Sequence, residues 1–494
     1  MREFIKIRST NFDLALGNVN KNKETIKDLV KQADKDGVNI LSLPELSLTG
    51  ASLYDGYWDL AEICEDAIMD LIEFSKDYKV LFSVGFPFIY NRKIYNAIGL
   101  IINGSLVNLT TKKNLSTIEK NVFSTDLPDH DFLNAFDSWP NINIDYSTID
   151  GLAIDVTIGE DEEMTIPRSL EYKAKLGERH EIILHPCANP KFALNEEDII
   201  NRVKFLSKDV TYVLTSSGMG ESSTDFVYGG LNIIANDGEI IAHTSNAPID
   251  YIGKYYINVD EDSLFPTTFT KETNKCEKFP YLPDYERGEQ YVNDVLDIGA
   301  TGLISRMKHI GIKDVFLGVS GGLDSTMALL TIVHAYKKEG WDYSGIHCYT
   351  MPAFGTSDRT KSNAYKLCQA LGLELEEINI SEAVSIHLRD IGHDGKTSDT
   401  AYENAQARER TQVLFDLANM GNGIVIGTGD LSENMQGFAT YNGDQMSNYS
   451  LNASLMKTEI RYIVGAIAEK TDNIKLKSVS VSYTHLTLPT TPYV

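Results

Sequence analysis

The sequence predicts an α/β protein built from two consecutive units. Residues 1–260 alternate short apolar runs, typical of buried strands, with amphipathic stretches typical of helices. Prolines and charges then interrupt this pattern, and the alternation resumes at residue 289. We therefore expect one domain at 1–260, a linker at 261–288, a second domain at 289–477 and a separate tail at 478–494.

Composition limits the partners that this chain can have. Its 494 residues suffice for two or three domains, and its net charge is -25. Nucleic acids and anionic membranes require basic patches, so we expect neither as a partner. The five cysteines are scattered without a C-x-x-C pair, and no run has the form of a signal peptide or the length of a membrane span. These features predict a cytoplasmic protein with reduced thiols.

The first unit is expected to contain an amphipathic helix and a series of short strands. The helix is predicted at 23–37, where Gly37 has the position of a helix C-terminal glycine. Strands are predicted at 37–45, 80–90, 97–104, 151–159, 181–188, 210–217 and 229–236.

The second unit should begin with a helix from Glu289 through Ile310, followed by a strand and a glycine-rich loop. The stretch "VFLGVSGGLDSTMALL" runs from the apolar strand Val315–Val319 through that loop directly into another helix. Glycines let backbone N–H groups approach phosphate oxygens, and the helix N-terminus adds partial positive charge. The loop has no Walker lysine but contains Asp324, and a carboxylate among phosphates requires Mg²⁺ between them. The alternative is a glycine turn that binds nothing.

The loop "SGGLDS" resembles the signature of the ATP-pyrophosphatase (PP-loop) superfamily. Downstream segments are similar, in order and spacing, to NAD synthetases of the glutamine-dependent type. They are "MPAFGTSDRT" (351–360), "YENAQARER" (402–410), "GTGDLSE" (427–433), "GFATYNGDQMSNYSLNAS" (437–454) and "MKT" (456–458). The resemblance implies a Rossmann-like domain, with Met456 standing where the family usually has proline.

The resemblance also implies a reaction and a set of site residues. The carboxylate of deamido-NAD attacks the α-phosphate of ATP, pyrophosphate leaves, and ammonia then displaces AMP from the acyl-adenylate. Asp324 and Glu433 would hold Mg²⁺, whereas Arg410 is expected on a solvated helix face. The implied ATP-binding residues are Gly318, Ser320, Gly321, Gly322, Leu323, Asp324, Ser325 and Thr428. The implied residues of the deamido-NAD pocket are Asn404, Arg408, Glu433, Asp444, Tyr449 and Lys457.

The first unit resembles the nitrilase-like (carbon–nitrogen hydrolase) domain that these synthetases carry. That resemblance implies an α-β-β-α sandwich with a Glu-Lys-Cys triad that releases ammonia from glutamine. "LSLPELSLTG" matches the glutamate segment and supplies Glu45. "TTKKNLSTIEKNVF" lies at the lysine segment, where Lys112 has the expected spacing and Lys113 is the alternative. "SSTDFVYGGLNIIANDGEIIAHTS" matches the closing segment of the domain.

The third member of the triad is missing from its expected place. The family segment reads approximately E-I-C-E-D, whereas residues 157–161 read "TIGED", with Gly159 at the cysteine position. Hydrolysis through a thioester needs a sulfur nucleophile, and glycine has none. Thr157 offers only a weakly nucleophilic hydroxyl, and Cys187 would require a rebuilt triad and is better interpreted as a buried structural thiol. We therefore predict an inactive glutaminase domain in which Glu45 and Lys112 are remnants.

Three interpretations follow from these features. The first is an ATP-dependent NAD synthetase, expected to be a homo-oligomer, that takes ammonia directly. The second is a non-catalytic pseudoenzyme that binds nucleotides or partners an active paralogue. The third is an incomplete gene product, because the resemblance ends near Lys477 while the family continues. The stretch 478–494 fits neither unit, and both a poorly ordered tail and a non-native end agree with its composition.

Overall fold

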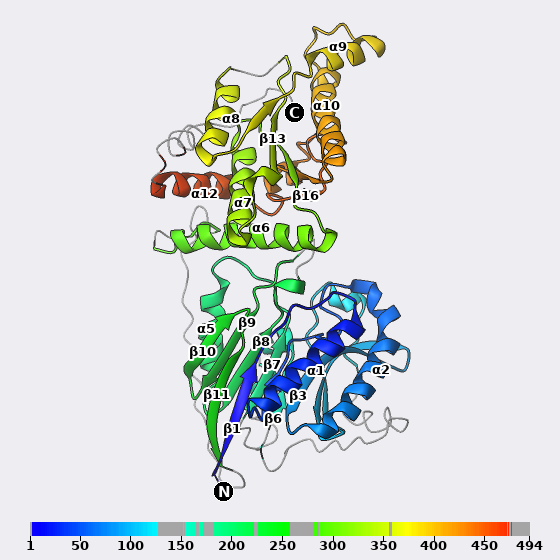
Figure 1. Ribbon diagram of the computed structural model, residues 1–494, viewed down its shortest axis with the longest axis vertical. Coiled ribbons are helices and arrows are strands. Elements are labelled where there is room, and N and C mark those ends of the chain that lie inside the picture. Colours follow the sequence, from blue (N-terminus) through cyan, green and yellow to red (C-terminus); the bar gives the residue numbers. More distant parts are fainter. Residues whose placement is uncertain are drawn as a thin grey trace. The chain divides into compact units, whose positions relative to one another are not determined.

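The computed structural model describes residues 2–126, 152, 154–164, 167–170, 182–221, 226–256, 281–283, 286–354, 358–471, 473 and 476 (Figure 1). The chain forms two compact units, Met1–Lys191 with Asn195–Thr273, and Asn274–Val494 with Phe192–Leu194. Most of the predicted linker and all of the predicted tail lie outside the described residues. In the described part of the chain, no helix combines the length and apolar character needed to cross a membrane.

The described part of the first unit contains two sheets. The six-stranded sheet has the order β11-β1-β2-β3-β4-β5, and the five-stranded sheet has the order β10-β9-β8-β7-β6. The strands of the first sheet are β1 (Arg2–Ser9), β2 (Ile40–Ser42), β3 (Leu81–Tyr90), β4 (Lys93–Ile102), β5 (Ser105–Thr111) and β11 (Ile249–Tyr256). Those of the second are β6 (Ile154–Val156), β7 (Ile182–Cys187), β8 (Thr211–Ser216), β9 (Leu231–Asn236) and β10 (Glu239–Ser245).

The two sheets pack face to face, and helices cover their outer faces. One buried cluster joins Ile98 of the first sheet to Leu184 and Val213 of the second. The outer face of the first sheet packs against α1 (Val19–Lys35) and α2 (Tyr57–Phe74). The outer face of the second packs against α5 (Asn195–Leu206). This arrangement confirms the predicted α-β-β-α sandwich.

Each strand predicted in this unit overlaps an observed strand, although β4 begins at Lys93, four residues before the predicted start, and β1, β5, β10 and β11 were not predicted. Exposure explains one of these omissions, because the side chains of β10 alternate between exposed and half-buried positions. A strand that is not fully buried lacks the continuous apolar run that marks the buried strands. The predicted helix at 23–37 begins earlier, at Val19, because the Asn18 side chain accepts a hydrogen bond from Lys21 N.

The second unit is a parallel sheet with helices on both faces. Its order is β14-β13-β12-β15-β16, and the paired strands are parallel throughout. The strands are β12 (Val315–Gly318), β13 (Ile346–Thr350), β14 (Leu375–Glu377), β15 (Ile424–Gly427) and β16 (Tyr449–Ser450). This layered architecture confirms the predicted Rossmann-like domain.

Alternate residues of β12 enter two separate cores. Leu317 packs in a cluster with α6 (Gly288–Ile310), α7 (Leu323–Glu339), α8 (Asp358–Leu371) and α12 (Lys457–Lys470). Phe316 packs in the opposite cluster with α9 (Ser381–Asp390) and α10 (Thr400–Met420). The chain order reverses between β12 and β15, and open α/β sheets bind ligands beyond the carboxyl ends of the strands at such a point.

Candidate active sites

The glycine-rich loop that the sequence predicts to bind phosphate follows β12 at this reversal point. Val319 N donates to Tyr349 O at 2.7 Å, which ties the start of the loop to the neighbouring strand. Gly321 has a φ of +77°, a left-handed conformation that favours glycine. The α7 helix begins at once after Gly322, which provides no side-chain cap. The N–H groups at the start of α7 therefore point toward the loop, as an anion site requires.

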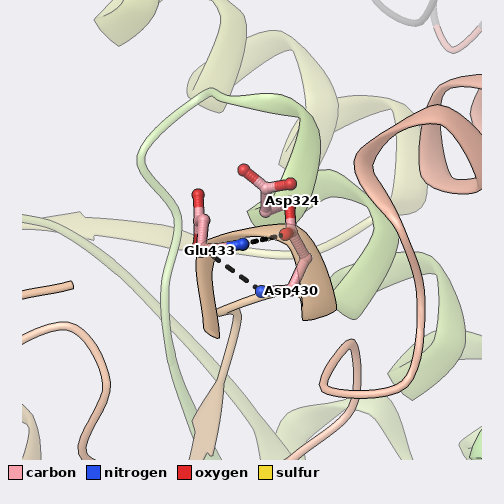
Figure 2. A group of neighbouring side chains, drawn as sticks. All are labelled: Asp324, Asp430 and Glu433. Atoms are coloured by element: carbon pink, nitrogen blue, oxygen red, sulfur yellow. Dashed lines mark hydrogen bonds between the residues drawn. The ribbon is translucent and has the colours of Figure 1, made fainter. Parts of the chain in front are cut away.

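Two carboxylates of the short helix α11 (Leu431–Gln436) meet one from α7. Asp430 is the N-cap of α11, and its Oδ1 accepts a hydrogen bond from Glu433 N at 2.8 Å. Figure 2 shows Asp324, on the first turn of α7, facing Asp430 and Glu433. The ligand oxygens of the three residues lie within 4.8 Å of one another. Asp430 is completely buried, and its second carboxylate oxygen, Oδ2, lies beside Lys457 Nζ.

Lys457, the first residue of α12, is surrounded by these three carboxylates. Its Nζ lies 2.8 Å from Asp324 Oδ1, 2.6 Å from Asp430 Oδ2 and 2.9 Å from Glu433 Oε1. Burial raises the pKa of Asp324 to about 6 against the opposing effect of Lys457, and the negative charges of Glu433 and Asp430 raise it further. Burial lowers the pKa of Lys457, but the carboxylates outweigh that effect and raise it overall.

The donor set fits a hard divalent cation. Carboxylate oxygens are the ligands that Mg²⁺ prefers. Asp324 Oδ1 and Asp430 Oδ2 are buried, and each forms an ion pair with Lys457 Nζ. Neither atom accepts a hydrogen bond within the part of the chain that the structure describes. Such oxygens retain the capacity to bind a positive charge.

The remaining predicted residues of this unit lie in two places. Thr428 and Asp324 are linked by Asn452, whose Nδ2 donates to both backbone carbonyls at 3.0 and 2.9 Å. Tyr449 lies on β16 beside β15, and burial raises its pKa.

Asn404 and Arg408, both on α10, contact the loop that follows α11. Asn404 Oδ1 accepts from Thr440 Oγ1 at 2.8 Å, and Arg408 Nε donates to Tyr441 O at 3.1 Å. Asp444 accepts from Thr440 N at 2.7 Å, so it lies in the same cluster.

One expectation for α10 is wrong. Arg410 does not lie on a solvated helix face, because it is partly buried and its Nε donates to Met351 O at 3.1 Å. Burial lowers its pKa. The exposed arginine is Arg408. Sequence reasoning also missed Asp430 and Asn452, although D-x-x-E at 430–433 is a capping-box pattern that signals a helix start.

In the first unit, Glu45 and Lys112 form a buried ion pair. Their side chains are each 2% exposed, and Lys112 Nζ lies 2.8 Å from Glu45 Oε1. Lys112 also pairs with Glu119 at 2.8 Å and with Glu160. Burial raises the pKa of Glu45 to about 7, against the opposing effect of Lys112. Lys112 thus faces Glu45, whereas the backbone N of Lys113 donates to Asp161.

Gly159 lies where this ion pair converges. Its φ is +48°, at the junction between β6 and the short 3₁₀ helix Gly159–Glu163. An ideal Cβ at this position would lie 2.7 Å from Glu45 Oε2 and 2.8 Å from Lys112 Nζ. A sharp turn between a strand and a helix is the local geometry that presents a nucleophile in hydrolases. The backbone therefore has the conformation of such a site, while the side chain is absent.

Neither rival nucleophile has an activated environment. Cys187, at the end of β7, is 1% exposed, and burial raises its pKa to about 12, so it stays a thiol at neutral pH. Thr157 is completely buried. The four described cysteines, Cys64, Cys187, Cys348 and Cys368, are free thiols.

Comparison with known proteins supports a single family across the chain. The family model described as NAD synthase matches residues 298–474. The glutamine-dependent NAD(+) synthetase of Mycobacterium leprae is 31% identical over 93% of this chain and 75% of its own length. That of Mycobacterium bovis is 28% identical over 99% of this chain and 79% of its own.

Solved structures extend the likeness to the fold. The glutamine-dependent NAD+ synthetase of Acinetobacter baumannii, solved with ADP, has a TM-score of 0.76 at 18% identity, over 99% of this chain and 86% of that one. That of Cytophaga hutchinsonii has a TM-score of 0.74 at 17% identity, over 99% and 84%. At these identities the two structures show a shared fold.

Proposed function

The chain belongs to the glutamine-dependent NAD(+) synthetase family, and we propose that, unlike a glutamine-dependent enzyme, it takes its nitrogen directly from ammonia. As a member of the family it is a ligase, an NAD(+) synthase. The observation that carries the proposal is Gly159, which faces Glu45 and Lys112 without a nucleophile. A thioester cannot form there, so glutamine is not a nitrogen donor.

The synthetase reaction assigns roles to residues of the second unit. ATP binds with its phosphates at the loop Gly318–Ser325 and near Thr428, while Asn404, Arg408, Asp444 and Tyr449 hold deamido-NAD. A carboxylate oxygen of deamido-NAD attacks the α-phosphorus and pyrophosphate leaves; ammonia then attacks the acyl carbon, loses a proton and displaces AMP. Mg²⁺, held by Asp324 and Glu433 with Asp430, would supply charge neutralisation at the phosphates. The protein contributes mostly positioning and electrostatic stabilisation.

The first test compares two nitrogen sources. Purified protein with deamido-NAD and Mg·ATP should form NAD+ when ammonium is supplied, and none above background when glutamine replaces it. Glutamate release should also be absent. Thr157 and Cys187 are the two alternative nucleophiles. Glutaminase activity that persists after both are mutated would contradict the proposal that the domain has lost its nucleophile. ATP binding without NAD+ formation from either source would favour the rival function, a non-catalytic nucleotide-binding subunit.

The second test concerns Asp324 and nucleotide binding. Asp324→Ala should weaken Mg·ATP binding by about 1.5–3 kcal/mol, the worth of a charge-assisted contact. Asp416→Ala, which removes an exposed carboxylate of α10, is the matched control and should leave the affinity unchanged. Calorimetry measures both affinities. An Asp324→Ala protein that binds as tightly as wild type would show that the loop is only a turn.

A further inference from the structure

Lys457 occupies the centre of the carboxylate group formed by Asp324, Asp430 and Glu433. Its ammonium is within 2.9 Å of an oxygen from each of the three. The oxygens of these residues also lie close enough together to share one metal ion. The ammonium is therefore located where a cation bound by the same oxygens would be.

The fold places this lysine in an electrostatically unfavourable position. Lys457 is the first residue of α12, and a helix N-terminus repels a cation. Its backbone N donates to Ser432 Oγ at 3.0 Å, and Ile460 and Ile463 anchor the helix in the core. The backbone of Lys457 is thus fixed beside α11, and the three carboxylates supply the attraction that the helix terminus does not.

A metal ion and this ammonium cannot use the same oxygens together. Asp430 Oδ1 caps α11, which leaves Oδ2 as the oxygen that faces the group, and Lys457 Nζ lies 2.6 Å from it. Mg²⁺ approaches its oxygen ligands to about 2.0–2.1 Å, so an ion bound to these oxygens would repel an ammonium among them at short range. Occupation by one cation therefore excludes the other.

We propose that Lys457 is an internal counter-ion that holds the three carboxylates in the nucleotide-free protein and leaves them when a divalent cation arrives with a polyphosphate. The inference rests on the proposed function, because it takes this group as the metal site. The side chain of Lys457 is 16% exposed, and its flexible stem allows Nζ to move from the carboxylates to a neighbouring phosphate.

This exchange couples the metal to the nucleotide. A divalent ion alone must displace the ammonium without offering it a new partner, so it binds weakly. When a polyphosphate is present, the displaced ammonium gains an anionic partner, and both ligands bind better together than alone. The exchange of Lys457 for a metal ion therefore favours binding of the metal together with the nucleotide.

The test measures Mn²⁺ binding to nucleotide-free protein by electron paramagnetic resonance. Lys457→Met should bind Mn²⁺ at least about tenfold more tightly than wild type, within the ordinary range of coupling between ligands. The same variant should bind Mg·ATP at least about tenfold more weakly, because it has lost a cation that reaches phosphate. If Lys457 had only a structural role, its substitution would not raise the Mn²⁺ affinity while lowering the Mg·ATP affinity.

Two further variants serve as controls. Lys470→Met removes an exposed lysine at the other end of α12, which pairs with Glu289, and should change neither affinity. Lys457→Arg keeps a cation among the carboxylates and should not gain Mn²⁺ affinity. If Lys457→Met is poorly folded, Mn²⁺ should still raise its Tm more than it raises that of wild type.

Unchanged or weaker Mn²⁺ binding by folded Lys457→Met, or equal Tm shifts, would overturn the inference. The assay contains neither deamido-NAD nor a nitrogen source. Its result is therefore independent of whether glutamine or ammonia is used.

Discussion

The two units each surround one lysine with three carboxylates, but in different environments. Lys112 meets Glu45, Glu119 and Glu160, and its side chain is 2% exposed. Lys457 meets Asp324, Asp430 and Glu433 and is 16% exposed. The first group lies around Gly159, whereas the second lies at the carboxyl ends of the strands of a parallel sheet. The same charges therefore act as a structural ion cluster in one unit and as a proposed cation site in the other.

The two clusters differ in whether their carboxylates would remain unpaired if the lysine moved away. Glu45 is buried in the sandwich, where an unpaired charge has a large desolvation cost. The carboxylates around Lys457 can instead pass to another cation. Burial thus decides whether a charged cluster only stabilises the fold or can also exchange its partner.

The largest expected effect comes from removing each lysine in turn. Lys112→Met should destabilise the first unit by about 3–5 kcal/mol, because it leaves buried carboxylates unpaired. Lys457→Met should lower the unfolding free energy of the second unit by less than this, and Mn²⁺ should restore much of the lost stability. Urea unfolding measures both, with Lys120→Met, at an exposed lysine of the same segment, as the control. Equal losses from both lysines, with no recovery in Mn²⁺, would remove the distinction between the two clusters.

A smaller effect is expected at Gly159. Any side chain there must adopt a φ of +48° and fit a Cβ 2.7 Å from Glu45 Oε2. Gly159→Ala and Gly159→Cys should each destabilise the protein by about 1–3 kcal/mol. We expect partial or no glutamate release from Gly159→Cys, because catalytic groups tolerate little misplacement. Alkylation followed against pH then reports whether Lys112, with Nζ 2.8 Å from the Cβ position, lowers the pKa of the new thiol.

Gly340→Ala separates backbone strain from crowding at Gly159. Gly340 has a φ of +66° with open space around its Cβ position, so its substitution costs strain alone. If alanine at residue 159 lowers the unfolding free energy no more than alanine at residue 340, the side chains of Glu45 and Lys112 move aside at little energetic cost. Glutamine hydrolysis by Gly159→Cys at a rate typical of working glutaminases would show that one substitution is the whole lesion.

The third expected effect is a difference in pH dependence between the two groups. The pKa of Glu45 is raised from 4.5 to about 7 in the folded protein, so the folded state holds its proton more tightly than the unfolded chain. The stabilisation from this proton is complete below pH 4.5 and is lost as the pH rises to about 7. The unfolding free energy of wild type should therefore fall relative to that of Glu45→Gln across this window.

Asp324 should show the same sign in a lower window. Its pKa is raised from 3.8 to about 6, so wild type should lose stability relative to Asp324→Asn between these values. Urea unfolding across the pH range measures both differences. Stability that rises with pH relative to either variant would mean that the carboxylate is stabilised in its charged form and would contradict the effect of burial.

The sequence alone was sufficient for the fold class of both units and for the absence of a nucleophile at residue 159. These properties depend on local order along the chain: apolar periodicity predicts buried strands, and a glycine at the cysteine position has no sulfur in any fold. Strands with exposed faces, such as β10, were missed because only packing distinguishes them from loops.

The tertiary structure decided which charges meet and how deeply they are buried. Asp324, Asp430 and Lys457 are far apart in the sequence, and only the parallel sheet brings the starts of α7, α11 and α12 together. It also brought Lys112 to Glu45 and placed the partly buried Arg410 against Met351. Burial and ion pairing depend on surfaces from several elements at once, so no single segment of the sequence contains them.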